Sequence, residues 1–176
     1  MKALLLSISL AVILCYLWYA SLVKKRQSAI DTLMALSLKV TRRIEIIEQL
    51  ISVVTPDSPH HAEAEKIRQQ LTFIHQKNAW PNKIDDNLPS YLAAWSTIDQ
   101  QCSAAFSLID EHQVSESLVN EYAQLALDFQ NANQFYNQAV TDLNQGVNMF
   151  PGSIVAKLAK ISAMPLMEQS SDQNLG

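Results

Sequence analysis

The side chains of this sequence best suited to chemistry are His60, His61 and Glu65, which we call the histidine cluster. Imidazole and carboxylate groups bind transition metals, and a helix would place His61 and Glu65 on one face. Three ligands within one helical turn seldom converge on an ion, and the sequence has no His-x3-His, HExxH or CxxC motif. The alternative is a polar first turn whose acidic residues complement the helix dipole. We therefore predict no metal and no other cofactor, with the histidine cluster as the candidate ligand set.

The other reactive side chains do not form a catalytic motif. Cys102 falls on the apolar face of a predicted helix, where a thiol is normally an inert core residue. Asp85 and Asp86 lie in a turn-forming stretch. The sequence contains neither a glycine-rich phosphate loop nor a nucleophile elbow. We predict that the protein is not an enzyme, and the alternative is a metal-dependent sensor or enzyme that uses the histidine cluster.

An uncharged apolar run occupies residues 3–23. As a helix it would be about 31 Å long, which is enough to cross a hydrocarbon core of about 30 Å. The aromatic rings of Trp18 and Tyr19 suit the headgroup level near its end. A cleaved signal peptide is the alternative, but its apolar region would be shorter and would precede small residues. The sequence thus predicts an uncleaved anchor over residues 1–23, with residues 3–23 in the bilayer.

Basic residues follow the apolar run immediately. They are Lys24, Lys25 and Arg26, with Lys39, Arg42 and Arg43 further along, whereas only Lys2 precedes the run. Lys and Arg near the end of a span favour the cytoplasmic side of the membrane. This distribution predicts a single-pass protein with its N-terminus outside and its soluble domain in the cytoplasm. Lys24, Lys25 and Arg26 are candidate contacts for lipid headgroups, each worth about 1 kcal/mol near an anionic surface.

Apolar residues beyond this basic cluster recur at helical spacing. The first seam consists of Ile30, Leu33, Val40, Ile44, Ile47, Ile51 and Val54, with Ser37 as its polar member. The first helix should therefore continue to about residue 54. Further helices are expected over residues 58–76, with Ser58 as N-cap, and over residues 91–111 and 118–150.

These helices predict an all-α fold. An antiparallel up-and-down four-helix bundle is the simplest arrangement, because the first and last long helices have matched lengths and coiled-coil-like spacing. A bent, elongated three-helix arrangement is the alternative. We expect an anchor at 1–23, a bundle at 24–161 and a disordered tail at 162–176.

Three stretches of the sequence resemble the LemA family. They are "SLVKKRQSAID", "RRIEIIEQLI" and "FYNQAVTDLNQGVNMFPGSIVA". The motif residues are Arg42, Arg43, Glu45, Tyr136, Asn137, Val140, Asn144, Phe150 and Pro151. The chain departs from the family pattern at Glu45, Glu48, Asn133 and Leu143, which stand in place of Asp, Pro, Arg and Tyr. The resemblance implies a helical bundle and a membrane anchor with its N-terminus outside, and it brings no settled enzymatic activity. We expect the membrane to be the bacterial inner membrane.

The "FYN…FP" stretch suits a structural role. Tyr136, Leu143 and Phe150 are seven residues apart and should share the bundle seam, while Asn137 and Asn144 could fix the register of the helices. The alternative is that this helix forms a partner-binding face.

Charge is distributed unevenly along the chain. Residues 84–156 contain nine acidic side chains and no Lys or Arg, and the formal net charge of the chain is −4. An acidic body argues against nucleic-acid binding. The alternative is a solvated face that is partly paired with cations of the first helix. We expect an interaction or scaffold module of the bacterial envelope that binds a protein partner through this acidic face. A homo-oligomer is a further possible form of the protein.

Overall fold

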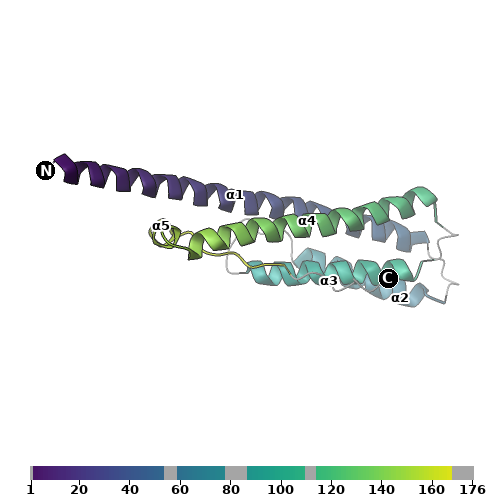
Figure 1. Ribbon diagram of the computed structural model, residues 1–176. Helices are drawn as coiled ribbons and strands as arrows, with labels where there is room; N and C mark the ends of the chain where they lie inside the picture. The colour runs from purple at the N-terminus through teal and green to yellow at the C-terminus, as the bar shows by residue number, and fades with distance from the viewer. Residues whose placement is uncertain (1, 54–58, 78–86, 110–113, 168–176) are drawn as a thin grey trace. The chain divides into compact units, whose positions relative to one another are not determined.

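The computed structural model in Figure 1 describes residues 2–53, 59–77, 87–109 and 114–167. These residues form five helices, and no β-strand occurs among them. In chain order the helices are α1 (Lys2–Val53), α2 (His61–Lys77), α3 (Leu88–Ser107), α4 (Glu116–Asn148) and α5 (Gly152–Ala159). The predicted all-α class is confirmed.

The chain folds as two compact units. The anchor unit consists of Met1–Leu33 and Phe135–Leu166, and the bundle unit consists of Met34–Gln134 and Met167–Gly176. Helices α1 and α4 each contribute one part to each unit.

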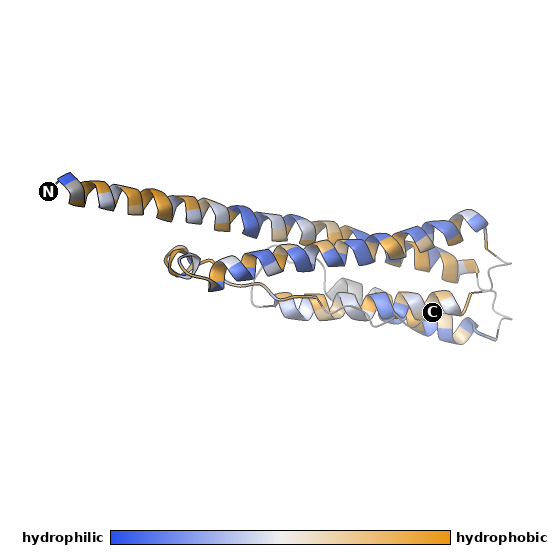
Figure 2. Ribbon diagram, in the orientation of Figure 1, coloured by the Kyte–Doolittle hydropathy of each residue, from blue (hydrophilic) through white to orange (hydrophobic). Residues whose placement is uncertain are grey.

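Helix α1 begins with apolar residues on all sides and continues with apolar residues on one side (Figure 2). Among the described residues it is the one helix whose length and composition would allow it to cross a membrane, with a mean hydropathy of 2.0 over its most apolar window. The helix ends at Val53, as the first seam predicts, and Val54 lies outside the described residues. A long apolar N-terminal helix is compatible with a membrane-anchored protein.

The core of the bundle unit receives side chains from α1, α2, α3 and α4. The buried apolar residues of α1 in this unit are Leu36, Val40, Ile44, Ile46, Ile47, Leu50 and Ile51. Four of them, Val40, Ile44, Ile47 and Ile51, belong to the predicted seam. Ile46 and Leu50 widen the buried face beyond a single seam, because this part of α1 packs against more than one helix.

The anchor unit has its own small core. Leu22, Val155 and Ala156 are buried together, and Trp18, Val147 and Ile161 pack against them. Helix α5 thereby lies against the part of α1 that carries Trp18 and Leu22.

Gly152, the first residue of α5, is required by a close approach of two backbone segments. A Cβ atom at this position would lie 2.1 Å from the carbonyl oxygen of Gly146 and 3.3 Å from the ring of Trp18. The tight turn between α4 and α5 therefore has no space for a side chain at Gly152.

Several predicted boundaries need correction. Helix α2 begins at His61 rather than at its predicted start, and the predicted cap Ser58 lies outside the described residues. Helix α3 runs from Leu88 to Ser107 and is thus shifted toward the N-terminus. Order at the C-terminal end continues beyond residue 161, because Met164 and Met167 are buried. Residues 168–176 lie outside the described residues.

The placement of Phe150 in the bundle seam was wrong. Tyr136 and Leu143 are fully buried as predicted, but 78 % of the Phe150 surface is exposed. Helix α4 ends at Asn148, so Phe150 lies in the turn before α5 and no longer follows the helical repeat.

The turn before α5 gives a testable contrast between two glycines. Gly152→Ala should destabilise the full-length protein by an amount toward the upper end of the ~1–3 kcal/mol range for overpacking, because a backbone oxygen cannot move aside. Gly146→Ala is the matched control, since its Cβ would meet the flexible tip of Leu22 at 2.9 Å and alanine favours the helix by up to about 1 kcal/mol. Thermal unfolding in detergent, followed by circular dichroism, measures both. Equal losses for the two variants would contradict this description of the turn.

Candidate functional site

A charged side chain, Arg43, lies inside the core of the bundle unit with 3 % of its surface exposed. Its Nη1 atom forms an ion pair with Asp99 of α3, and its Nη2 atom donates a hydrogen bond of 3.0 Å to the Tyr122 hydroxyl of α4. The guanidinium carbon lies 5.4 Å from the centre of the Tyr122 ring and 5.3 Å from that of Phe129. We call Arg43, Asp99, Tyr122 and Phe129 the Arg43 cluster. Burial of an unpaired charge is costly, so these contacts are what permits an arginine at this position.

The tyrosine of the Arg43 cluster is itself held by packing. Its ring stacks on Phe106, with the centroids 4.3 Å apart and the planes 16° from parallel. Burial raises the pKa of the Tyr122 hydroxyl, and the positive charge of Arg43 opposes this shift. Among the described residues, the Arg43 Nε is the one buried side-chain nitrogen or oxygen with no hydrogen-bond partner.

Cys102 of α3 is buried in the same unit, as the apolar face of its helix predicts. Burial raises the pKa of its thiol to about 11, while the nearby charge of Arg43 acts in the opposite direction. The thiol is therefore protonated at neutral pH and is a poor nucleophile.

The two arginines of the family motif have opposite environments. Arg42 is exposed and forms ion pairs with Glu45 at 2.9 Å and with Glu121 at 2.6 Å. The hydrogen bond to Glu121 is the largest of the effects that raise the pKa of Arg42. The sequence analysis counted Arg42 and Arg43 among the basic residues that follow the apolar run and did not predict that Arg43 is buried. The available signal was the position of Arg43, three residues after Val40 and four before Ile47, on the apolar face of α1.

Part of the predicted acidic face is paired with cations of α1. Glu121 binds Arg42, and Asp128 accepts a hydrogen bond of 2.5 Å from Lys39, which lowers the pKa of Asp128. Of the three residues proposed to contact headgroups, Lys24 and Arg26 are exposed, whereas Lys25 is half-buried. The Lys25 ammonium donates a hydrogen bond of 3.1 Å to the backbone carbonyl of Asp142.

The histidine cluster does not assemble into a metal site. His60 lies in the turn before α2, His61 is the first residue of α2, and Glu65 accepts two hydrogen bonds from Arg68. These bonds are the main cause of the lowered pKa of Glu65. Within the described ranges, no group of three or more His, Cys, Asp or Glu side chains is arranged to hold a metal ion. Asp85 and Asp86 lie outside the described residues.

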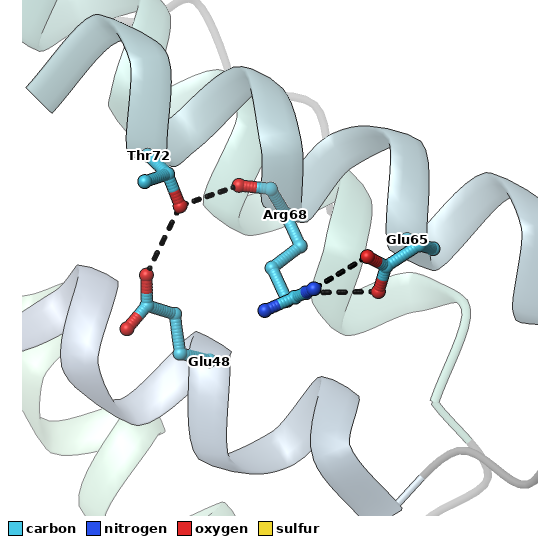
Figure 3. A network of polar contacts seen from close by, with 4 residues as sticks. All are labelled: Glu48, Glu65, Arg68 and Thr72. Atoms are coloured by element: carbon cyan, nitrogen blue, oxygen red, sulfur yellow. Dashed lines mark hydrogen bonds and ion pairs between the residues drawn. The ribbon is translucent and has the colours of Figure 1, made fainter.

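Arg68 and Glu65 belong to a network of polar contacts between α2 and α1 (Figure 3). The Thr72 hydroxyl lies 3.3 Å from a carboxylate oxygen of Glu48 and 3.0 Å from the backbone carbonyl of Arg68. The charge of Glu48 also contributes to the raised pKa of Arg68, after the larger effect of Glu65. Glu48, which replaces the proline of the family pattern, therefore links α1 to α2.

The "FYN…FP" stretch holds the segment that follows α5. The Tyr136 hydroxyl donates a hydrogen bond of 2.7 Å to the carbonyl of Pro165, and burial raises the pKa of this hydroxyl. The Asn144 amide donates to the Met164 carbonyl at 2.8 Å and accepts from the Met164 N–H at 2.9 Å. We call these three hydrogen bonds the C-terminal clamp.

The clamp changes the interpretation of this motif. Asn144 was predicted to fix helix register, but its side chain forms hydrogen bonds with the backbone of Met164, in an irregular segment. Val140 is buried, Asn137 and Pro151 are half-buried, and Asn133, where the family has Arg, is buried. Sequence periodicity finds the buried face of α4, but it carries no signal for hydrogen bonds to a segment without a repeat.

These features define the chain as an all-α protein with a long apolar N-terminal helix and a core that contains a paired arginine. The sequence matches the model of the LemA family over residues 32–175, which is most of the chain. The protein therefore belongs to the LemA family, as the motif residues predict. No curated protein and no solved structure matches the sequence.

The C-terminal clamp predicts a change in protease sensitivity. Asn144→Ala leaves both backbone groups of Met164 without their side-chain partner, so the segment after α5 should open more often. Limited trypsin digestion should then cleave faster after the exposed Lys160 and release residues 161–176. Gln138→Ala, an exposed position on the same helix, is the control and should cleave at the wild-type rate. Unchanged cleavage in Asn144→Ala would show that the clamp does not hold this segment.

Proposed function

We propose that this LemA family protein is a membrane-anchored scaffold without catalytic activity. In this proposal its α1 helix spans the bacterial inner membrane, its N-terminus is outside, and its bundle unit presents a docking surface to a protein partner in the cytoplasm. The basic residues Lys24, Lys25 and Arg26, directly after the apolar run, support this orientation.

The observation that carries the proposal is the continuity of α1. The helix runs from Lys2 to Val53 without interruption and supplies both the apolar stretch and part of the core of the bundle unit. No flexible linker separates the two, so a partner bound to the bundle unit would be held close to the membrane.

The use of the reactive side chains supports a binding role rather than catalysis. The Cys102 thiol has a pKa of about 11, and the guanidinium of Arg43 is engaged in the core. Tyr136 and Asn144 bind the backbone of the protein itself. The metal-dependent alternative gains no support from Glu65, which is hydrogen-bonded to Arg68.

Large apolar side chains are exposed on the bundle unit. Phe73 of α2 has 64 % of its surface exposed, and Leu127 of α4 has 55 %. Two residues of the predicted acidic face, Glu121 and Asp128, already form ion pairs within the protein. We therefore add these two exposed apolar positions to the acidic face as candidate parts of the docking surface, because apolar and aromatic side chains are common at protein interfaces.

Photo-crosslinking in membranes of living cells tests the scaffold. A photoreactive phenylalanine at Phe73 or Leu127 of the full-length chain should give discrete adducts with a protein found on the cytoplasmic side. The same residue at Trp95, an aromatic position with 4 % exposure, is the matched control and should give none.

The outcomes separate the parts of the proposal. Adducts at Phe73 and Leu127 with exported proteins would contradict the orientation. Adducts with a second copy of the chain alone would point to a homo-oligomer in place of a scaffold for another protein. The absence of adducts at both positions would contradict these residues as the docking surface.

A further inference from the structure

An exposed apolar patch lies at the end of the anchor unit where α4 meets α5. It consists of Met149, Phe150, Ile154 and Leu158, with exposed surface fractions of 62 %, 78 %, 53 % and 81 %. We call these four residues the α5 patch. Exposed apolar patches on one end of a protein mark contact sites for proteins or membranes, because water solvates them poorly.

Helix α5 is apolar on two sides. Val155 and Ala156 are buried in the anchor core, whereas Ile154 and Leu158, four residues apart, share an exposed side. A helix that packs on the protein through one face needs only polar residues on the other. The second apolar face therefore requires an explanation beyond the fold of the anchor unit.

The position of α5 along α1 points to the bilayer as the partner. The buried face of α5 lies against Leu22 and Trp18, and both residues fall within the apolar run 3–23. In α1, Trp18 precedes the first basic residue, Lys24, by about 9 Å along the helix axis. The α5 patch thus belongs to a helix packed on the last turns of the segment that would lie in lipid.

Charges beside the patch agree with a headgroup environment. Lys157 and Lys160 are exposed on and directly after α5, and Lys24 and Arg26 are exposed on α1 beyond Leu22. An interfacial helix typically buries its apolar side by about 5–10 Å in the headgroup and acyl boundary and keeps lysines at the headgroups. Trp18, against which α5 packs, lies about 9 Å from Lys24 along α1, and this separation falls within that range of depths.

We propose that the α5 patch enters the interface of the bilayer and binds lipid headgroups and upper acyl chains, as a second membrane contact beside α1. The proposal rests on the membrane anchor of the proposed function. It explains why Phe150 is exposed in the turn between α4 and α5, since its ring would lie in lipid instead of in the bundle core. It also fixes the anchor unit against the membrane surface, because α1 alone could rotate and tilt.

Fluorescence quenching by lipids tests this contact on the full-length protein. Phe150 or Leu158 is replaced by a single cysteine in a Cys15→Ser background. This cysteine carries an environment-sensitive fluorophore, whereas Cys102 is buried and stays unlabelled. The protein is reconstituted into phosphatidylethanolamine and phosphatidylglycerol vesicles that contain a lipid with a nitroxide near the top of its acyl chain. Both labels should be quenched at least about twofold more strongly than a label at the control position Phe135, because an interfacial helix lies at the depth of this nitroxide.

Two controls make the result decisive. Phe135→Cys is the matched control, because Phe135 is a phenylalanine of the same unit with 67 % exposure and lies about 20 Å from the end of α4. A label on the native Cys15 reports the anchor itself and should be quenched by a nitroxide deep in the acyl chain.

The possible results distinguish the two proposals. Quenching at Cys15 without extra quenching at positions 150 and 158 would overturn the interfacial contact and leave the anchor intact. No quenching at Cys15 would overturn the anchor and the contact together. A blue-shifted label at position 150 that lipid nitroxides do not quench would also overturn the proposal, because a protein surface would then cover the patch.

Discussion

The charge of Arg43 is the constraint on which the bundle unit depends. A guanidinium in an apolar core is tolerated only if hydrogen-bonding and ionic partners replace water. Those partners come from two other helices, Asp99 from α3 and Tyr122 from α4, so the three helices must meet at one level. The cluster therefore fixes the relative positions of α1, α3 and α4 within this unit, whereas apolar packing alone would tolerate some sliding.

In the anchor unit, buried backbone groups likewise need hydrogen-bonding partners that replace water. The segment after α5 has no regular secondary structure, so its buried N–H and carbonyl groups need partners from side chains. Asn144 and Tyr136 provide them. Polar residues of the family motif, Arg43 in one unit and Tyr136 and Asn144 in the other, are thus used to hold the chain together.

Much of the fold follows from periodicity, because long amphipathic helices repeat their apolar residues regularly. This periodicity predicted the burial of most of the first seam on α1, of Cys102 on α3, and of Tyr136 and Leu143 on α4. The repeat failed at Phe150, where the helix ends before the pattern does. Arg43 was missed because charged residues are usually exposed, although its place in the α1 pattern was visible. The clamp could not be predicted, since Asn144 and Met164 are joined across a turn and a helix that carry no pairing signal.

The most direct test of whether the buried charge organises the bundle unit is to measure the free energy of unfolding of variants at Arg43 and Asp99. Asp99→Leu alone should destabilise the full-length protein by about 3–5 kcal/mol, because it leaves an uncompensated charge in the core. Adding Arg43→Met to the same protein should restore most of that stability, since apolar residues of similar volume can replace a buried ion pair. Losses that are small, or that simply add in the double variant, would contradict this account.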